Sequence, residues 1–246
     1  MDGMTRAQVD GAEAKDFALG GAPMRPRDAA TLILLDRKGG EFHVLMGRRS
    51  MKHAFMPGRL VFPGGRTDPA DGRVATPDSL HPDVEAKLIV GTGSRMSATR
   101  ARAIALSAVR ETYEEAGLLI GRGDGYQTKH EGWHGFAENG VAPTLSNLRM
   151  IARAITPPGR VRRFDTRFIA AWRDDVAVEL PCGPTEELEE LVWLPVGASV
   201  REEMPMITRS ILGDLTSRLA EDPALDPAYP VPFYRMRHKR MLRDLI

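Results

Sequence analysis

Three glutamates at helical spacing are the residues of this chain best suited to chemistry. Glu111, Glu114 and Glu115 lie within the run 108–118, so a helix through this run would project all three carboxylates from one face. Like charges at this spacing repel, and Arg110 is the neighbour that offsets them. Carboxylate oxygens suit hard cations such as Mg²⁺ or Mn²⁺, which commonly act on phosphates. We therefore predict a metal site here; the alternative is a solvated acidic helix face.

A longer pattern surrounds these glutamates. The string Arg-Glu-x-x-Glu-Glu-x-Gly-Leu at 110–118 resembles the core of the Nudix box, the signature of hydrolases that cleave nucleoside diphosphates linked to another group. Phe-Pro-Gly-Gly at 62–65 resembles the strand end and turn that open the box. A contiguous box would place its arginine at position 79, which is Ser79. The resemblance therefore implies a box split by an insertion of about thirty residues, at about 67–96.

The resemblance implies roles for the residues of the box. The three glutamates would bind Mg²⁺ or Mn²⁺, and the carbonyl of Gly65 would face the same metal, since a residue without Cβ lets the backbone approach an ion closely. The chain departs from the family pattern at Asp71, where the family has glutamate, and at Thr112, where it has an aliphatic residue. We expect Arg110 to pair with Asp71 and hold the box in shape; the alternative is a surface ion pair of little energetic value.

The split box resembles that of a coenzyme A diphosphatase-like branch of the family. Arg49, Ser50 and Gly58 match a coenzyme A motif of that branch, whereas His53 and Met56 depart from it. The resemblance implies that Arg49 and Ser50 contact the substrate. Arg49 could equally be an ordinary charge at the end of a strand.

Two further groups of charged residues are candidates for the site. Four glutamates at 186, 187, 189 and 190 precede a late strand, and we choose Glu187 as general base or metal ligand, although such a role needs hydrogen-bond reach. Arginines cluster around Pro157-Pro158-Gly159, and their guanidinium groups suit phosphate. We predict that Arg160 and Arg163 bind substrate phosphate; the alternative is charges at a sheet edge that discourage aggregation.

The stretch 130–134 spells His-Glu-x-x-His, the pattern of zinc proteases. That pattern works only when one helix places both histidines on the same face. Gly132 lies inside it and Gly135 follows, and glycine disfavours helix. We therefore predict a loop here and no zinc site.

Composition excludes several classes of protein. The formal net charge is +1 over 246 residues, which gives no global electrostatic reason to expect nucleic acid or an anionic membrane as a partner. No segment has the apolar length of a signal peptide or a membrane span. The one cysteine, Cys182, cannot form an internal disulfide, which favours a reducing compartment. We expect a cytoplasmic protein with a small nucleotide-type substrate; a homodimer is plausible for the fold.

The elements that would position these residues can be recognised from apolar runs and their terminators. Short apolar runs predict strands at 29–36, 42–46, 59–62, 150–156, 163–172 and 188–194. A helix should begin after Ser97 and end at Gly117, and a second should cover 206–219. Strands interleaved with two main helices agree with the α/β fold that the resemblance implies, a Nudix-type α/β/α sandwich with a mixed sheet.

We divide the chain into three parts. Residues 1–27 are expected to form an N-terminal extension or linker, 28–221 the hydrolase domain, and 222–246 a C-terminal tail that could act as a docking arm. The insertion at about 67–96 should be a surface flap with a short helix near 84–90.

The resemblance to the Nudix box implies a metal-dependent hydrolase of a nucleoside diphosphate derivative. Coenzyme A or an acyl derivative is our first choice, and ADP-ribose or a dinucleotide the alternative. A non-catalytic nucleotide-binding regulator with the same fold is the rival from another class.

Overall fold

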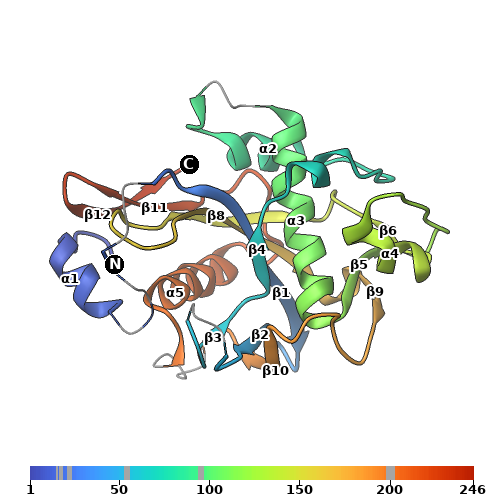
Figure 1. Cartoon of the computed structure of the whole chain (residues 1–246), viewed down its shortest axis with the longest axis horizontal. Helices are drawn as coiled ribbons and strands as arrows, with labels where there is room; N and C mark the ends of the chain where they lie inside the picture. The colour runs from blue at the N-terminus through green and yellow to red at the C-terminus, as the bar shows by residue number, and fades with distance from the viewer. Residues whose placement is uncertain (15, 17–18, 21–23, 53–55, 94–96, 198–202) are drawn as a thin grey trace.

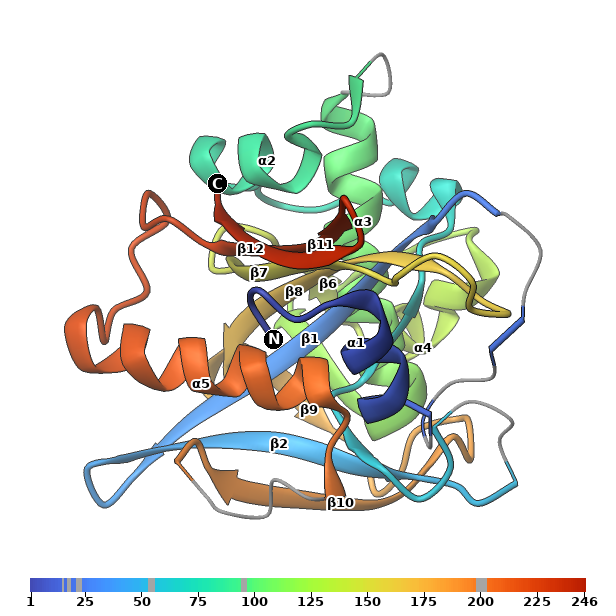
Figure 2. The same ribbon diagram turned by 90° about the vertical axis from the view of Figure 1, so that its left-hand side faces the viewer.

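The computed structural model describes residues 1–14, 16, 19–20, 24–52, 56–93, 97–197 and 203–246. Its centre is a twisted mixed sheet with helices on both faces, as Figures 1 and 2 show. Among the described residues, no helix combines the length and apolarity needed to cross a membrane. The α/β/α sandwich predicted from the sequence is confirmed.

The strands form one large sheet and one small one. The large sheet has the order β10-β2-β1-β8-β7-β11-β12, with β3 paired to β2 and β4 to β1, and the small sheet has the order β6-β5-β9. The strands of the large sheet are β1 (Arg27–Lys38), β2 (Glu41–Arg49), β3 (Leu60–Val61), β4 (Gly64–Arg66), β7 (Arg149–Ile155), β8 (Phe164–Trp172), β10 (Leu188–Pro195), β11 (Pro232–Arg237) and β12 (Arg240–Leu245). Those of the small sheet are β5 (Leu118–Arg122), β6 (Ala142–Pro143) and β9 (Val176–Glu179).

Five α-helices and three short 3₁₀ turns complete the described structure. The α-helices are α1 (Arg6–Ala12), α2 (Pro82–Ile89), α3 (Ala98–Ala116), α4 (His134–Glu138) and α5 (Met206–Glu221). The 3₁₀ turns are η1 (Pro69–Arg73), η3 (Glu131–Trp133) and η4 (Arg173–Asp175). Helices α2 and α3 cover one face of the large sheet, and α1 and α5 lie on the other (Figure 2).

Strand β1 lies near the middle of the sheet because its side chains are apolar on both faces. Ala30, Leu32 and Leu34 pack in the core beneath α3, and Ile33 and Leu35 pack in the core beneath α5. This alternation follows from the two-residue period of a strand. A strand that is apolar on both sides needs cover on both faces, and the two helix layers supply it.

Helix α3 has the ends that the sequence predicts. The Ser97 hydroxyl caps its N-terminus by accepting a hydrogen bond from the backbone N–H of Arg100, and Gly117 ends it at a φ of 71°. A Cβ at Gly117 would lie 2.7 Å from the carbonyl oxygen of Cys182. Glycine at this position therefore satisfies both the left-handed backbone and the close approach of the 182–183 loop.

Both ends of the chain are part of the folded domain, which corrects our expectation of a linker and a tail. The segment 222–246 contributes β11 and β12, and β11 pairs in parallel with β7. In the segment 1–27, Val9 is fully buried in the core beneath α5. Backbone hydrogen bonds join Gly3 to Met241 and Met241 to Met4. Strand β7 thus gains a partner for its backbone groups, which would otherwise lie at a sheet edge.

The insertion is also more than a surface flap. Val84 and Leu88 of α2 are fully buried against α3. Two arginines of the sheet hold the C-terminal end of α2, because Arg167 donates to the Leu88 carbonyl at 3.0 Å and Arg153 to the Val90 carbonyl at 2.6 Å. Carbonyls at a helix end have no partner within the helix, so these bonds attach the insertion to the sheet.

We predict that Leu88→Ala lowers the free energy of unfolding by about 2–4 kcal/mol, because it removes a fully buried side chain from the core. Denaturant unfolding would measure the change. Val161→Ala, at a position 49% exposed, is the control. A loss at Leu88 no larger than that of the control would contradict the placement of the insertion in the core.

Candidate active site

The two separated parts of the Nudix-like pattern meet in the structure. Strand β4 carries Gly64 and Gly65, and it lies beside α3 (Figure 1). The backbone N–H of Gly64 donates to Glu115 at 3.0 Å. A Cβ on Gly65 would lie 2.4 Å from the carboxylate of Glu111. The insertion therefore leaves Gly64 and Gly65 in contact with the glutamate helix, and a side chain at position 65 would displace the Glu111 carboxylate.

The three helix glutamates are not a solvated face. The Glu115 residue is buried, and the side chains of Glu111 and Glu114 are 12% and 25% exposed. One nitrogen of Arg110, Nη1, lies 2.9 Å from the Glu111 carboxylate and 2.8 Å from that of Glu114. Such burial of like charges is unfavourable unless each charge has a partner.

A buried aspartate orients Arg110. The guanidinium lies 3.2 Å from the Asp71 carboxylate, which confirms the predicted pairing, and it also donates to the carbonyl of Arg66. The indole N–H of Trp133 donates to the same Asp71 oxygen at 2.9 Å. Trp133 was not predicted as a site residue, because its place within the stretch 130–134 gives no sign of a contact with Asp71. A fully buried indole needs a hydrogen-bond acceptor, but the sequence does not show which one.

A fourth carboxylate, Glu187, joins Glu111 and Glu115 from the loop before β10. Arg49 of β2 forms an ion pair with Glu187. Burial raises the pKa of Glu115, and the neighbouring Glu187 raises it further. Burial likewise raises the pKa of Glu111 to about 7, against the opposing effect of Arg110. The sequence therefore identified a glutamate that lies next to the helix carboxylates.

The donor set fits a hard divalent cation. Glu115 Oε1 is buried, and when Glu115 and Glu187 are both ionised it accepts no hydrogen bond from the described residues. Within the described ranges, no three acidic, histidine or cysteine side chains already converge as a ligand set, and Arg110 draws the carboxylates of Glu111 and Glu114 towards itself. Glu111, Glu115 and Glu187 offer carboxylate oxygens, the kind of ligand that Mg²⁺ and Mn²⁺ prefer.

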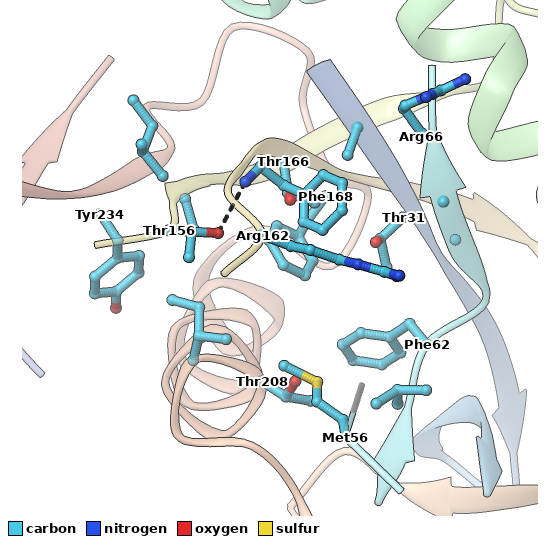
Figure 3. Close-up of a pocket in the computed structure, with 18 of the residues that line it drawn as sticks. Thr31, Met56, Phe62, Arg66, Thr156, Arg162, Thr166, Phe168, Thr208 and Tyr234 are labelled. Carbon is cyan, nitrogen blue, oxygen red and sulfur yellow. Dashed lines mark hydrogen bonds between the residues drawn. The ribbon is translucent and has the colours of Figure 1, made fainter. Parts of the chain in front are cut away.

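A cavity of about 410 Å³ adjoins these carboxylates. Its lining includes Gly65, Glu111, Glu187 and Arg49 at the carboxylate end. From there it extends over the α5-facing side of the sheet, where Figure 3 shows aromatic and threonine side chains around it. Its volume is within the range of pockets for small molecules.

Of the residues predicted to bind the substrate, some line the cavity and others contact the protein elsewhere. Arg49 lines the cavity. Ser50 is buried, and its hydroxyl donates to Glu189 instead of facing the cavity. Arg163 donates to the carbonyls of Thr156 and Met24. The motif residue His53 lies outside the described residues.

Arg160 has a structural role. It is fully buried and forms ion pairs with Asp10 at 2.6 Å and Glu13 at 2.7 Å. These contacts fasten the segment around α1 to the sheet, which corrects our placement of Arg160 among phosphate-binding residues. The arginine of this cluster that lines the cavity is Arg162. Its guanidinium end lies beside Thr31 (Figure 3).

The zinc-protease pattern does not form a zinc-protease helix. His130 precedes η3, and His134 begins the separate helix α4. Trp133, between them, is buried and bonded to Asp71. This segment packs against the site and supports Asp71.

Comparisons with known proteins identify the fold. No family model matches the chain, and no curated protein matches it. A Nudix hydrolase from Alicyclobacillus acidocaldarius is 25% identical, with a TM-score of 0.51 over 82% of this chain and 86% of that one. RenU, a Nudix hydrolase from M. smegmatis, is 18% identical, with a TM-score of 0.44 over 85% and 95% of the two chains. The Nudix domain of Shewanella oneidensis NrtR, solved with ADP-ribose, is 12% identical, with a TM-score of 0.44 over 80% and 90%. The first comparison shows that this chain has the fold of a Nudix hydrolase.

We predict that Gly65→Ala weakens Mn²⁺ binding about 10- to 100-fold, the effect typical of changes that displace the supports of a metal ligand. The added Cβ would overlap the Glu111 carboxylate. Isothermal titration with Mn²⁺ would measure the affinity. Gly213→Ala is the matched control, because a Cβ there meets nothing within 4 Å. An affinity within twofold of the wild-type value would contradict the close approach of Gly65 to the site.

Proposed function

We propose, from the premise that this chain is a hydrolase with the Nudix fold, that it cleaves the diphosphate linkage of a nucleoside diphosphate derivative with the help of Mg²⁺ or Mn²⁺. The observation that carries the proposal is that Glu111 and Glu187 line one end of a cavity beside Gly65, with the buried Glu115 next to Glu187. Buried carboxylates with raised pKa values, grouped in a cleft, are a frequent mark of a reactive site.

The bound cation would neutralise diphosphate oxygens and lower the pKa of a water molecule enough to supply hydroxide near neutral pH. Glu111 and Glu115 would hold the cation, and Arg110 would keep Glu111 and Glu114 in place. Glu187 is our choice for the group that accepts the proton of the attacking water. Its ion pair with Arg49 would hold its carboxylate beside Glu111 and Glu115, within the reach that a general base requires.

For the substrate we propose coenzyme A or an acyl derivative first, and ADP-ribose or a dinucleotide second. The position of Arg49 on the cavity supports the first choice, because Arg49 belongs to the coenzyme A-like motif. Ser50 adds no support, because its hydroxyl binds Glu189. The cytoplasmic location and the homodimer stay predictions.

A binding protein without turnover is the rival function. Simple nucleotide binding gains little from three carboxylates that repel one another and must be buried. Here Glu111, Glu114 and Glu115 are all present and partly or fully buried, which favours the enzyme.

We expect phosphate-ester products when a panel of nucleoside diphosphate derivatives is incubated with the protein and Mg²⁺. Glu115→Gln should lower kcat at least 100-fold, because it removes a charge from the cation site. Glu114→Gln should also lower it, because it weakens the ion pair that positions Arg110 beside Glu111. Glu190→Gln, on a side chain 57% exposed, is the control and should keep wild-type activity. Full turnover by both site variants would refute the metal role, and ligand binding without turnover would favour the regulator.

Arg49→Ala tests the choice of substrate. We expect kcat/KM for coenzyme A to fall at least tenfold more than kcat/KM for ADP-ribose, because a charged contact to the preferred substrate is lost. Arg48→Ala, which removes a half-exposed neighbour paired with Glu190, is the control. If the value for coenzyme A stays constant while other substrates are cleaved better, the coenzyme A assignment is wrong.

A further inference from the structure

The cavity beside the carboxylates crosses several strands of the sheet. Its lining includes Thr31 on β1, Phe168 on β8, Ile155 on β7, Tyr234 on β11 and Met241 on β12. These strands are consecutive in the sheet, in the order β1-β8-β7-β11-β12. Neighbouring strands lie about 4.8 Å apart, so β1 and β11 are separated by about 14 Å. The cavity therefore leads from the carboxylates to the hairpin formed by the C-terminal segment.

Apart from Glu13, the charged groups of the cavity gather at the carboxylate end, whereas threonine hydroxyls are spread along the lining. Glu111, Glu187 and Arg49 belong to that end, and the guanidinium of Arg162 also points towards it, beside Thr31 (Figure 3). Figure 3 places Tyr234 on the opposite side of the cavity from Arg66 of β4. A substrate that crosses the cavity therefore leaves its charged groups near β4.

The polar groups at the far end of the cavity already have partners within the protein. Thr156, which lies beside Tyr234 (Figure 3), accepts a hydrogen bond from the backbone N–H of Phe164 at 3.0 Å. The hydroxyl of Tyr234 donates to Asp214, so this polar group is already satisfied by the protein. Glu13, the acid contributed by the N-terminal segment, is buried and paired with Arg160 at 2.7 Å. Met1 and Met241 complete the lining contributed by the two terminal segments. Methionine is unbranched and flexible, which suits it to contact with apolar chains of variable shape.

Ion pairs and backbone hydrogen bonds hold the far end of the cavity in place. Arg160 joins the α1 segment to the sheet through Asp10 and Glu13. Met241 exchanges backbone hydrogen bonds with the N-terminal segment, from Gly3 at 2.9 Å and to Met4 at 2.8 Å. The two segments therefore form one connected wall, which we name the terminal wall and define by Met1, Tyr234 and Met241.

We propose that the group attached to the nucleoside diphosphate carries an apolar chain, as an acyl derivative does, that this chain lies across the sheet towards β11, and that the terminal wall limits its length. This inference rests on the proposed function, which places the diphosphate at the carboxylate end. Each methylene that enters apolar surroundings should strengthen binding roughly three- to fourfold. A chain longer than the distance to the terminal wall must bend or leave its end outside the cavity. The gain in affinity per methylene should therefore end at that length.

The test uses adenosine diphosphate n-alkyl esters of increasing chain length, from ethyl to tetradecyl. We expect kcat/KM with Mg²⁺ to rise with length, reach an optimum and then fall. Met241→Ala should move the optimum to a longer chain, and Met241→Trp to a shorter one. Leu245→Ala, on an exposed residue of the same strand, is the control and should leave the optimum where it is.

A measurement on the wild-type protein guards against variants that fail to fold. A decyl ester with a terminal diazirine should, after irradiation, label peptides of 1–13 or 232–245, and labelling confined to the β4 region would overturn the inference. A kcat/KM that does not change with chain length, or an unchanged optimum in both Met241 variants, would also overturn this inference. Either result would leave the hydrolase proposal intact. The opposite outcome is also distinguishable. If calorimetry without metal shows that affinity depends on chain length, but no ester is hydrolysed, the role of the terminal wall is supported and the hydrolase proposal is refuted.

Discussion

The site depends on one guanidinium placed among acids. Arg110 lies between Asp71 and two of the helix glutamates, Glu111 and Glu114, and it is only 11% exposed. Burial by itself would lower the pKa of Arg110, but the surrounding carboxylates raise it. Arginine suits this position because its planar fork can serve several acceptors at once and stays charged. Without it, the helix would bring the repelling charges of Glu111 and Glu114 together without the cation that lies between them.

This guanidinium also connects the parts of a box that the insertion separates. Asp71 belongs to η1 at the start of the insertion, and Trp133 reaches it from the segment before α4. The insertion therefore carries part of the support for the site and is itself attached to the sheet through α2. Arg153 and Arg167, which hold the end of α2, share Asp165 at 2.7 Å and 3.2 Å. The cost of burying these charges is offset by multiple hydrogen bonds to each of them.

The arginines near Pro157 illustrate how one residue type serves different purposes within a few positions. Arg160 fastens the N-terminal segment, Arg163 binds backbone carbonyls, and Arg162 reaches the cavity. These residues lie in the turn and bends between β7 and β8, where no regular strand or helix period aligns their side chains. A cluster of arginines in sequence therefore need not be a cluster in space.

The sequence by itself determined the features that depend on neighbours along the chain. Helix α3 has both of its predicted limits because its cap, Ser97, and its terminator, Gly117, act within one helical turn. The spacing of Glu111 and Glu115 likewise placed both on one side of that helix. The tertiary structure decided everything that needs contact between distant segments: the support of Asp71 by Trp133, the burial of Arg160, and the closure of the cavity by the two ends of the chain. Pairing of β11 with β7 and the choice of partner for a buried charge depend on the whole fold, because burial and the distance between far residues are properties of the packed chain and of no local pattern.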